Sequence, residues 1–187
     1  MPNQIVSHLC RFFADLISAA ILVLLCVPSA LAQPKPVRVG LDAEFGLDHS
    51  ISAQAVELGM RTAIAEINRA GGVLKGRPIE LVTKDHRSIP ARGIRNIEEF
   101  ARMPDLVAVF GGRFSPVIIE ELPVLTATRT LFLAPWSSAD GITDNDMSPN
   151  YVYRLSLRDS LAMPKLLQTA RKRGLNRVGL LLTNTSW

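Results

Sequence analysis

Short apolar runs alternate with amphipathic segments along most of the chain, and this alternation limits the possible folds more than any other feature. The runs have the length of buried strands, and they are 37–41, 78–83, 106–110, 130–134, 151–155 and 177–182. The segments between them place apolar residues at helical spacing, as Val56, Met60 and Ile67 do. The pattern predicts an α/β fold, with a doubly wound, mostly parallel sheet and helices on both faces.

The first residues have the features of an export signal. An apolar run at 16–27 follows Arg11 and leads to the Ala-Leu-Ala sequence at 30–32, which suits signal peptidase. We therefore expect a cleaved signal peptide at 1–32 and a periplasmic domain at 33–187. An uncleaved membrane anchor is the alternative, although the run is short for a spanning helix.

Cysteine and histidine usage excludes several kinds of site from the expected mature domain. Both cysteines, Cys10 and Cys26, lie in the leader, so the domain has no disulfide and no cysteine nucleophile. The three histidines, His8, His49 and His86, lack the spacing of metal ligands. We expect no metal and no cofactor.

Charge and motifs also argue against nucleic-acid binding and catalysis. The net charge is only +4, and the basic cluster 171–173 ends a predicted helix, where cations suit the helix dipole. No dinucleotide-binding, phosphate-binding or nucleophile-elbow motif is present. Asp42 and Glu44 could form an acid pair, but we expect the end of the strand to send them to opposite sides. We expect a binding protein that is not an enzyme.

Candidate ligand-binding residues follow the predicted strands, whose carboxyl ends meet at one edge of a parallel sheet. Ser115 and Pro116 come after two glycines, and they predict a helix with Ser115 as N-cap and Pro116 in first position. The free amides of such a helix suit an anion, and an ordinary capped helix is the alternative. The other candidates at this edge are His49, Phe114, Trp136, Ser138 and Asp159. Hydroxyls, amides, aromatics and one acid suit a small zwitterion.

Several stretches together resemble one known family. The first is VRVGLDAEFG followed by AVELGMRTAIAEINRAGGVLKGRPIELVTKD, and AVFGGRFSP, LFLAPWSSAD and YVYRLSLRDS come after it in order. They are similar to the type I periplasmic binding proteins of the Leu/Ile/Val-binding kind, which are substrate-binding components of ABC transporters. The resemblance covers 36–187. It implies two lobes with ligand between them, of which this chain matches the first, up to the first crossover between lobes.

The resemblance also implies a function and roles for individual residues. We expect the chain to bind an amino acid of the branched-chain type, or a similar small polar ligand, and to deliver it to an ABC transporter permease. An extracytoplasmic ligand-sensing domain of a signalling receptor is the alternative. By resemblance, Ser115 binds the ligand carboxylate, Ser138 adds a hydroxyl, Trp136 contributes backbone and Asp159 helps to hold the ammonium group.

The first loop departs from the family pattern, which has small residues there. This chain has Asp42 and Glu44, and two added acids favour either a more cationic ligand or a ligand that is none of the usual amino acids. Arg113 beside the expected pocket either compensates for them or is solvated. Trp136 is bulky where many members have a small residue, so the pocket is expected to be narrower or stacked, unless Trp136 packs on the sheet edge.

Overall fold

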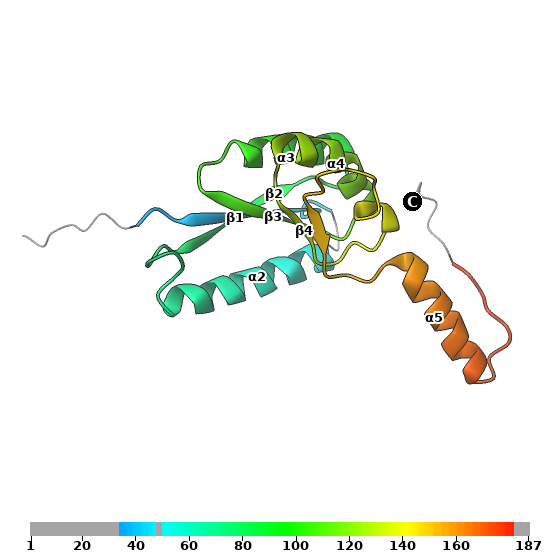
Figure 1. The fold of residues 1–187 in the computed structure, drawn as a ribbon. Coiled ribbons are helices and arrows are strands. Elements are labelled where there is room, and N and C mark those ends of the chain that lie inside the picture. Colours follow the sequence, from blue (N-terminus) through cyan, green and yellow to red (C-terminus); the bar gives the residue numbers. More distant parts are fainter. Residues whose placement is uncertain (1–33, 48–49, 182–187) are drawn as a thin grey trace, which may run out of the picture. The chain divides into compact units, whose positions relative to one another are not determined.

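Five strands form one parallel sheet with the order β2-β1-β3-β4-β5. The computed structural model describes residues 34–47 and 50–181. The strands are β1 (Val37–Ala43), β2 (Ile79–Asp85), β3 (Leu106–Gly111), β4 (Phe132–Ala134) and β5 (Val152–Arg154). β1 lies between β2 and β3, where Val37 is opposite Ile79 and Arg38 is opposite Leu106 (Figure 1).

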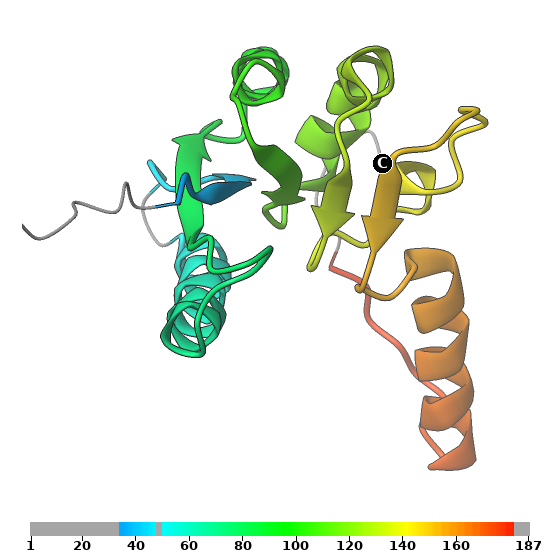
Figure 2. The same ribbon diagram turned by 60° about the vertical axis from the view of Figure 1, so that its left-hand side comes forward.

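Helices cover both faces of this sheet, as the alternating pattern predicts. The helices are α2 (Ile51–Arg69), α3 (Pro90–Ala101), α4 (Ser115–Thr128) and α5 (Asp159–Lys172), with a short 3-10 turn η1 (Asp140–Ile142). α2 lies on one face, whereas α3 and α4 lie on the other (Figure 2). The predicted doubly wound α/β class is confirmed.

Alternation along β1 decides which residues meet which helices. Leu41 and Ala43 are buried on the α2 side, together with Ala53 at the start of α2. Gly40 faces the other side, where a Cβ would come within 2.8 Å of the Phe100 ring. A larger residue at position 40 would therefore push α3 away from the sheet.

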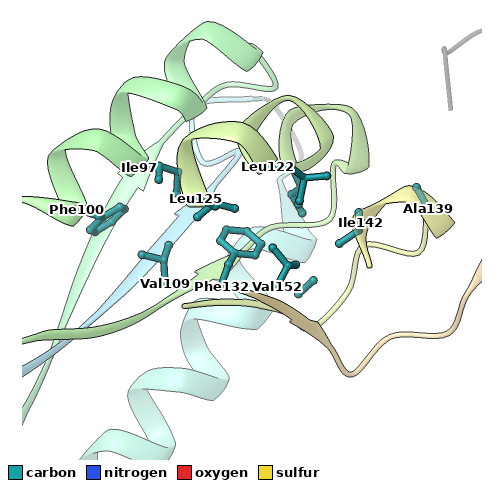
Figure 3. Packing of buried hydrophobic residues seen from close by; sticks show 11 residues of the cluster. Ile97, Phe100, Val109, Leu122, Leu125, Phe132, Ala139, Ile142 and Val152 are labelled. Atoms are coloured by element: carbon teal, nitrogen blue, oxygen red, sulfur yellow. The ribbon is translucent and has the colours of Figure 1, made fainter. Parts of the chain in front are cut away.

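The main core lies between the sheet and the helices α3 and α4. Its largest side chain from the strands is Phe132, which packs among residues of both helices and of β3 and β5 (Figure 3). The buried members are Ile97, Phe100, Val109, Ile118, Leu122, Leu125, Phe132, Ala134, Ala139, Ile142 and Val152. This core fixes α4, and therefore the residues at the amino end of α4, against the sheet.

Two predictions about the last part of the chain are wrong. The structure has no strand at 177–181, where Val178 and Leu180 are exposed. Similarly, the expected inner face of α5 is not buried: Met163 and Leu166 are exposed, and α5 has no buried residue. Apolar periodicity indicates that a helix has an apolar face, but it does not show that another element of the chain packs on that face.

Within 34–47 and 50–181, no helix has both the length and the hydropathy needed to cross a bilayer. The predicted signal peptide lies outside these residues.

Candidate functional site

The loops after β1, β3, β4 and β5 meet at the carboxyl edge of the sheet and are joined by hydrogen bonds. The Gly112 amide donates to the Asp42 carbonyl (2.8 Å), and the Ser137 hydroxyl donates to the Gly112 carbonyl (2.7 Å). The Asp159 amide donates to the Ser138 carbonyl (3.1 Å). The convergence that parallel strands predict is therefore present.

Ser115 is buried at this edge, but it does not cap its helix. α4 begins at Ser115 itself, and Phe114 occupies the N-cap position with extended backbone and no side-chain cap. The Ser115 hydroxyl instead accepts a hydrogen bond from the Ala139 amide (3.4 Å), in the loop after β4. The predicted N-cap role is wrong, because the chain becomes helical one residue earlier than the Ser-Pro pair suggests.

The β4 loop contributes two consecutive serines with different environments. Ser137 is buried and holds the β3 loop, whereas Ser138 is half-buried and its carbonyl also accepts from Arg154 Nη1 (3.1 Å). Trp136 is 52% exposed, so packing on the sheet does not bury its indole.

The remaining predicted site residues are only partly placed. Phe114 and Asp159 are both half-buried, and Asp159 is the first residue of α5 rather than its N-cap. His49 lies outside the described residues. The structure thus brings Phe114, Ser115 and Ser138 to one edge with Trp136 and Asp159.

Glu44 forms a buried polar cluster beside this edge, and its ion pair with Arg113 is one of the two alternatives that the sequence left open. Its side chain is fully buried, and its Oε1 accepts from the Ser52 hydroxyl (3.1 Å) and lies 3.4 Å from Arg113 Nε. Its Oε2 has no hydrogen-bond partner among the described residues. The nearest nitrogen of His86, Nε2, lies 3.7 Å from this oxygen. The partners come from distant positions, so only the fold brings them together.

His86 in this cluster is neutral. Its Nδ1 accepts a hydrogen bond from the Ser88 amide (2.9 Å), which places the ring proton on Nε2, toward Glu44. Burial lowers the pKa of His86, although the charge of Glu44 opposes this shift. Arg113 is therefore the cation that balances Glu44.

A pair of carboxyl groups lies on the opposite side of β1. Asp42 is buried and accepts from Asn96 Nδ2 (2.7 Å) on α3, and Glu121 of α4 is buried beside it. Burial raises the pKa of Asp42 to about 7, against the effect of the Asn96 hydrogen bond. Burial and the nearby Asp42 also raise the pKa of Glu121. Asp42 and Glu44 do face opposite sides, but alternation is not the reason: residues two apart in a strand share a face, and Glu44 lies beyond the end of β1.

One sequence signal could have indicated Glu121. It lies on the same helical face as Ile118, Leu122 and Leu125, so it is an acid among core positions of α4. A carboxyl group there needs a hydrogen-bonding partner across the core.

Apolar grooves lie on the α2 side of the sheet. One of about 220 Å³ is lined by Phe110, Leu133, Pro135, Tyr153 and Leu155 with neighbouring backbone, and so reaches the β4 loop. In the described segments no three His, Cys, Asp or Glu side chains are grouped to hold a metal ion. The edge thus offers hydroxyls, one arginine and aromatic surface, which is the chemistry of small-molecule binding.

Comparison with solved structures shows where similar lobes occur. An ABC transporter substrate-binding protein from Desulfitobacterium hafniense, in complex with Leu, is 25% identical with a TM-score of 0.64. The branched-chain amino acid transporter substrate-binding protein LivJ from Streptococcus pneumoniae, in complex with isoleucine, is 25% identical with a TM-score of 0.60. The matches cover 75% and 67% of this chain, but only 40% and 35% of those proteins.

A third solute-binding protein shares the fold. It is from R. palustris, in complex with 4-hydroxybenzoate, and is 19% identical with a TM-score of 0.63 over 75% of this chain and 37% of its own. A search of curated proteins returned no match. The family model described as "Periplasmic binding protein" matches residues 36–187. Since that match covers most of the chain and the fold agrees with it, the chain belongs to the periplasmic binding protein family.

Proposed function

We propose that this chain is the first lobe of an extracytoplasmic solute-binding protein that serves an ABC transporter permease. The observation that carries the proposal is the family match over 36–187. The polar loops that converge at the carboxyl edge of the sheet agree with it. The relatives complexed with Leu and isoleucine support a ligand of the branched-chain amino acid type or a similar small polar molecule. The family consists of solute-binding proteins, so we infer no enzymatic reaction.

The proposed ligand contacts are at the edge that the β3, β4 and β5 loops share. Ser115 supplies a hydroxyl that already accepts one hydrogen bond and still has its proton to donate to a ligand oxygen. Ser138 and Asp159 supply a hydroxyl and a carboxylate, and Phe114 and Trp136 supply ring surface, while His49 stays a prediction from the sequence alone. A second lobe would complete the contacts around the ligand. The greater length of the relatives supports such a lobe.

Periplasmic localisation is part of the same proposal. Its support is the family to which the chain belongs and the leader-like sequence at 1–32. Amino-terminal sequencing of the protein from a periplasmic extract tests it, and the expected first residue is Gln33. Recovery of the chain with Met1 in a membrane fraction would contradict cleavage.

The test of binding is calorimetric titration of the intact gene product with leucine and isoleucine. We expect micromolar affinity for at least one, which corresponds to about −8 kcal/mol. Ser115→Ala should weaken that binding roughly tenfold to a hundredfold, because a hydrogen bond to a charged group contributes about 1.5–3 kcal/mol.

Thr62→Ala is the matched control, since its hydroxyl is bonded to the Leu58 carbonyl on the exposed side of α2. Both variants must be titrated well below their melting temperatures, as shown by circular dichroism. If folded Ser115→Ala binds as tightly as Thr62→Ala, Ser115 is not a ligand contact.

A further inference from the structure

Arg113 has an unusual position for an exposed arginine. It follows the carboxyl end of β3 between the buried Gly112 and Phe114, two residues before Ser115. Its side chain is 50% exposed, and its Nε lies 3.4 Å from the fully buried Glu44 Oε1. Along 34–47 and 50–181, Glu44 is the only carboxylate within ion-pair distance of Arg113.

The carboxylate beneath Arg113 is held from several directions. Ser52 donates to its Oε1, and His86, as the neutral ring, directs Nε2 toward its Oε2. Gly112 leaves room for it, because a Cβ at that position would overlap Glu44 Oε2. The chain therefore keeps a buried, otherwise uncompensated negative charge directly beneath one arginine.

Only the Nε edge of Arg113 is used by this ion pair. In the described part of the chain, the terminal nitrogens Nη1 and Nη2 make no hydrogen bond, and the guanidinium group remains half exposed at the edge where ligand is proposed to bind. A guanidinium group fixed through one edge can present its other donors to a carboxylate as a pair.

We propose that Arg113 contacts an acidic group of the ligand and that Glu44 is a positioning residue that holds the guanidinium in place. This inference rests on the proposed solute-binding function. Ser115 is buried and neutral, so it can orient a carboxylate but does not balance its charge. Arg113 adds charged donors that Ser115 lacks, and the preferred ligands are therefore small organic acids whose carboxylate is essential to binding.

The experiment compares each acid with its amide on the intact gene product. The two pairs are L-leucine with L-leucinamide, and 4-hydroxybenzoate with 4-hydroxybenzamide, titrated by calorimetry. Wild type should prefer the acid in at least one pair. Arg113→Met should reduce that preference by on the order of tenfold or more. Arg113→Lys should reduce it by less, since lysine keeps the charge but cannot donate two parallel hydrogen bonds to a carboxylate.

Arg87→Met is the matched control. Arg87 is also an exposed arginine that pairs through Nε, with Asp85 Oδ2 at 3.2 Å beyond the carboxyl end of β2. Its loss should leave the acid preference unchanged. Because Arg113→Met leaves Glu44 unbalanced, the double variant E44Q/R113M removes both charges and provides a folded protein for the same comparison.

The outcomes separate this inference from the proposed function. Binding with the same acid preference in wild type, Arg113→Met and E44Q/R113M overturns the role of Arg113 and leaves solute binding intact. An equal loss for acid and amide also overturns it, since Arg113 would then be structural. Absence of binding by all four compounds overturns the proposed function for them and this inference with it.

Discussion

Asp42 and Glu121 are two carboxyl groups buried side by side, and they cannot both carry a charge without a large cost. Asp42 Oδ2 and Glu121 Oε1 each lack a hydrogen-bond partner in the described chain. The charged groups that act on Asp42 from outside the pair are Lys84, which favours its ionised form, and Asp85, which opposes it. The folded pair therefore retains protons that an unfolded chain would release.

This retention predicts a pH dependence of stability. Both carboxyl pKa values are raised in the folded state, that of Asp42 to about 7. The folded state then binds more protons than the unfolded state above about pH 4, so the free energy of unfolding falls as pH rises through about 7. One proton accounts for a fall of up to about 1.4 kcal/mol per pH unit.

Glu121→Gln should flatten this dependence, because the neutral amide keeps the shape and removes one of the two acids. The measurement is urea unfolding at several pH values from 5 to 8. Glu120→Gln, at the exposed neighbouring position of α4, is the control and should keep the wild-type slope. Parallel slopes for the two variants would contradict the assignment.

At the scale of elements, α3 and α4 approach closely at a glycine. A Cβ on Gly93 would lie 2.6 Å from Val117 Cγ1 and would also overlap Glu121 Oε1. Gly93→Ala should therefore destabilise the protein by about 1–3 kcal/mol, the usual cost of overpacking.

Gly59→Ala is the matched control for this helix contact. Gly59 is inside α2 with nothing within 4 Å of its Cβ position, so alanine should stabilise by about 0.5–1 kcal/mol through backbone entropy. Denaturant unfolding of both variants measures the difference. Equal effects would show that α3 and α4 can move apart without cost.

The end of α2 is tied to the edge strand β2 by one side chain. Asn68 Nδ2 donates to the Ile79 carbonyl (2.9 Å), and the Ile79 amide donates to Asn68 Oδ1 (2.7 Å). Asn68→Ala should lower the free energy of unfolding by about 1–3 kcal/mol, because both backbone groups lose their partner. Asn68→Asp keeps only the hydrogen-bond acceptor, so its free energy of unfolding should lie between those of wild type and Asn68→Ala. Urea unfolding measures all three. A wild-type midpoint for Asn68→Ala would contradict this role.

Most elements could be predicted from the sequence, because strand and helix periodicities are local properties. The apolar run 106–110 became β3 (Leu106–Gly111), and 37–41 became the first part of β1. The segment 177–181 has the same local pattern as those strands, yet it has no strand partner in the structure. Pairing is a non-local property, and local composition does not determine it.

For the whole molecule, the position of the candidate residues in the fold was more predictable than their contacts. Parallel strands bring their carboxyl ends together, which placed Ser115 and Ser138 at one edge. The side-chain directions there depend on packing between distant segments, such as Glu44 with His86 and Arg113. The hydroxyl of Ser115 turns to Ala139 for the same reason.

The α2 side of β4 and β5 exposes apolar surface. Tyr153 is 58% exposed and Leu155 is 88% exposed, and both line the groove of about 220 Å³ with Phe110 and Leu133. The chain 33–187 should therefore self-associate as its concentration rises, since contiguous apolar patches favour contact with other copies.

Sedimentation velocity over a range of concentrations measures this association. Leu155→Glu should reduce it, because a charge within the patch disfavours contact between copies. Leu58→Glu, which changes an exposed leucine of α2 (68% exposed) outside this groove, should have a smaller effect. Equal effects of the two substitutions would show that the groove is not the contact surface.

The place of β1 between two later strands has a consequence for how fast the protein folds. β1 is the first strand of the chain, but its two neighbours begin at Ile79 and Leu106, much further along. Each pairing closes a long loop before any contact compensates for the lost chain entropy. Folding should therefore take milliseconds to seconds rather than microseconds, as in other sheets built from distant strands. During synthesis, β1 cannot pair on both sides until β2 and β3 have also been made.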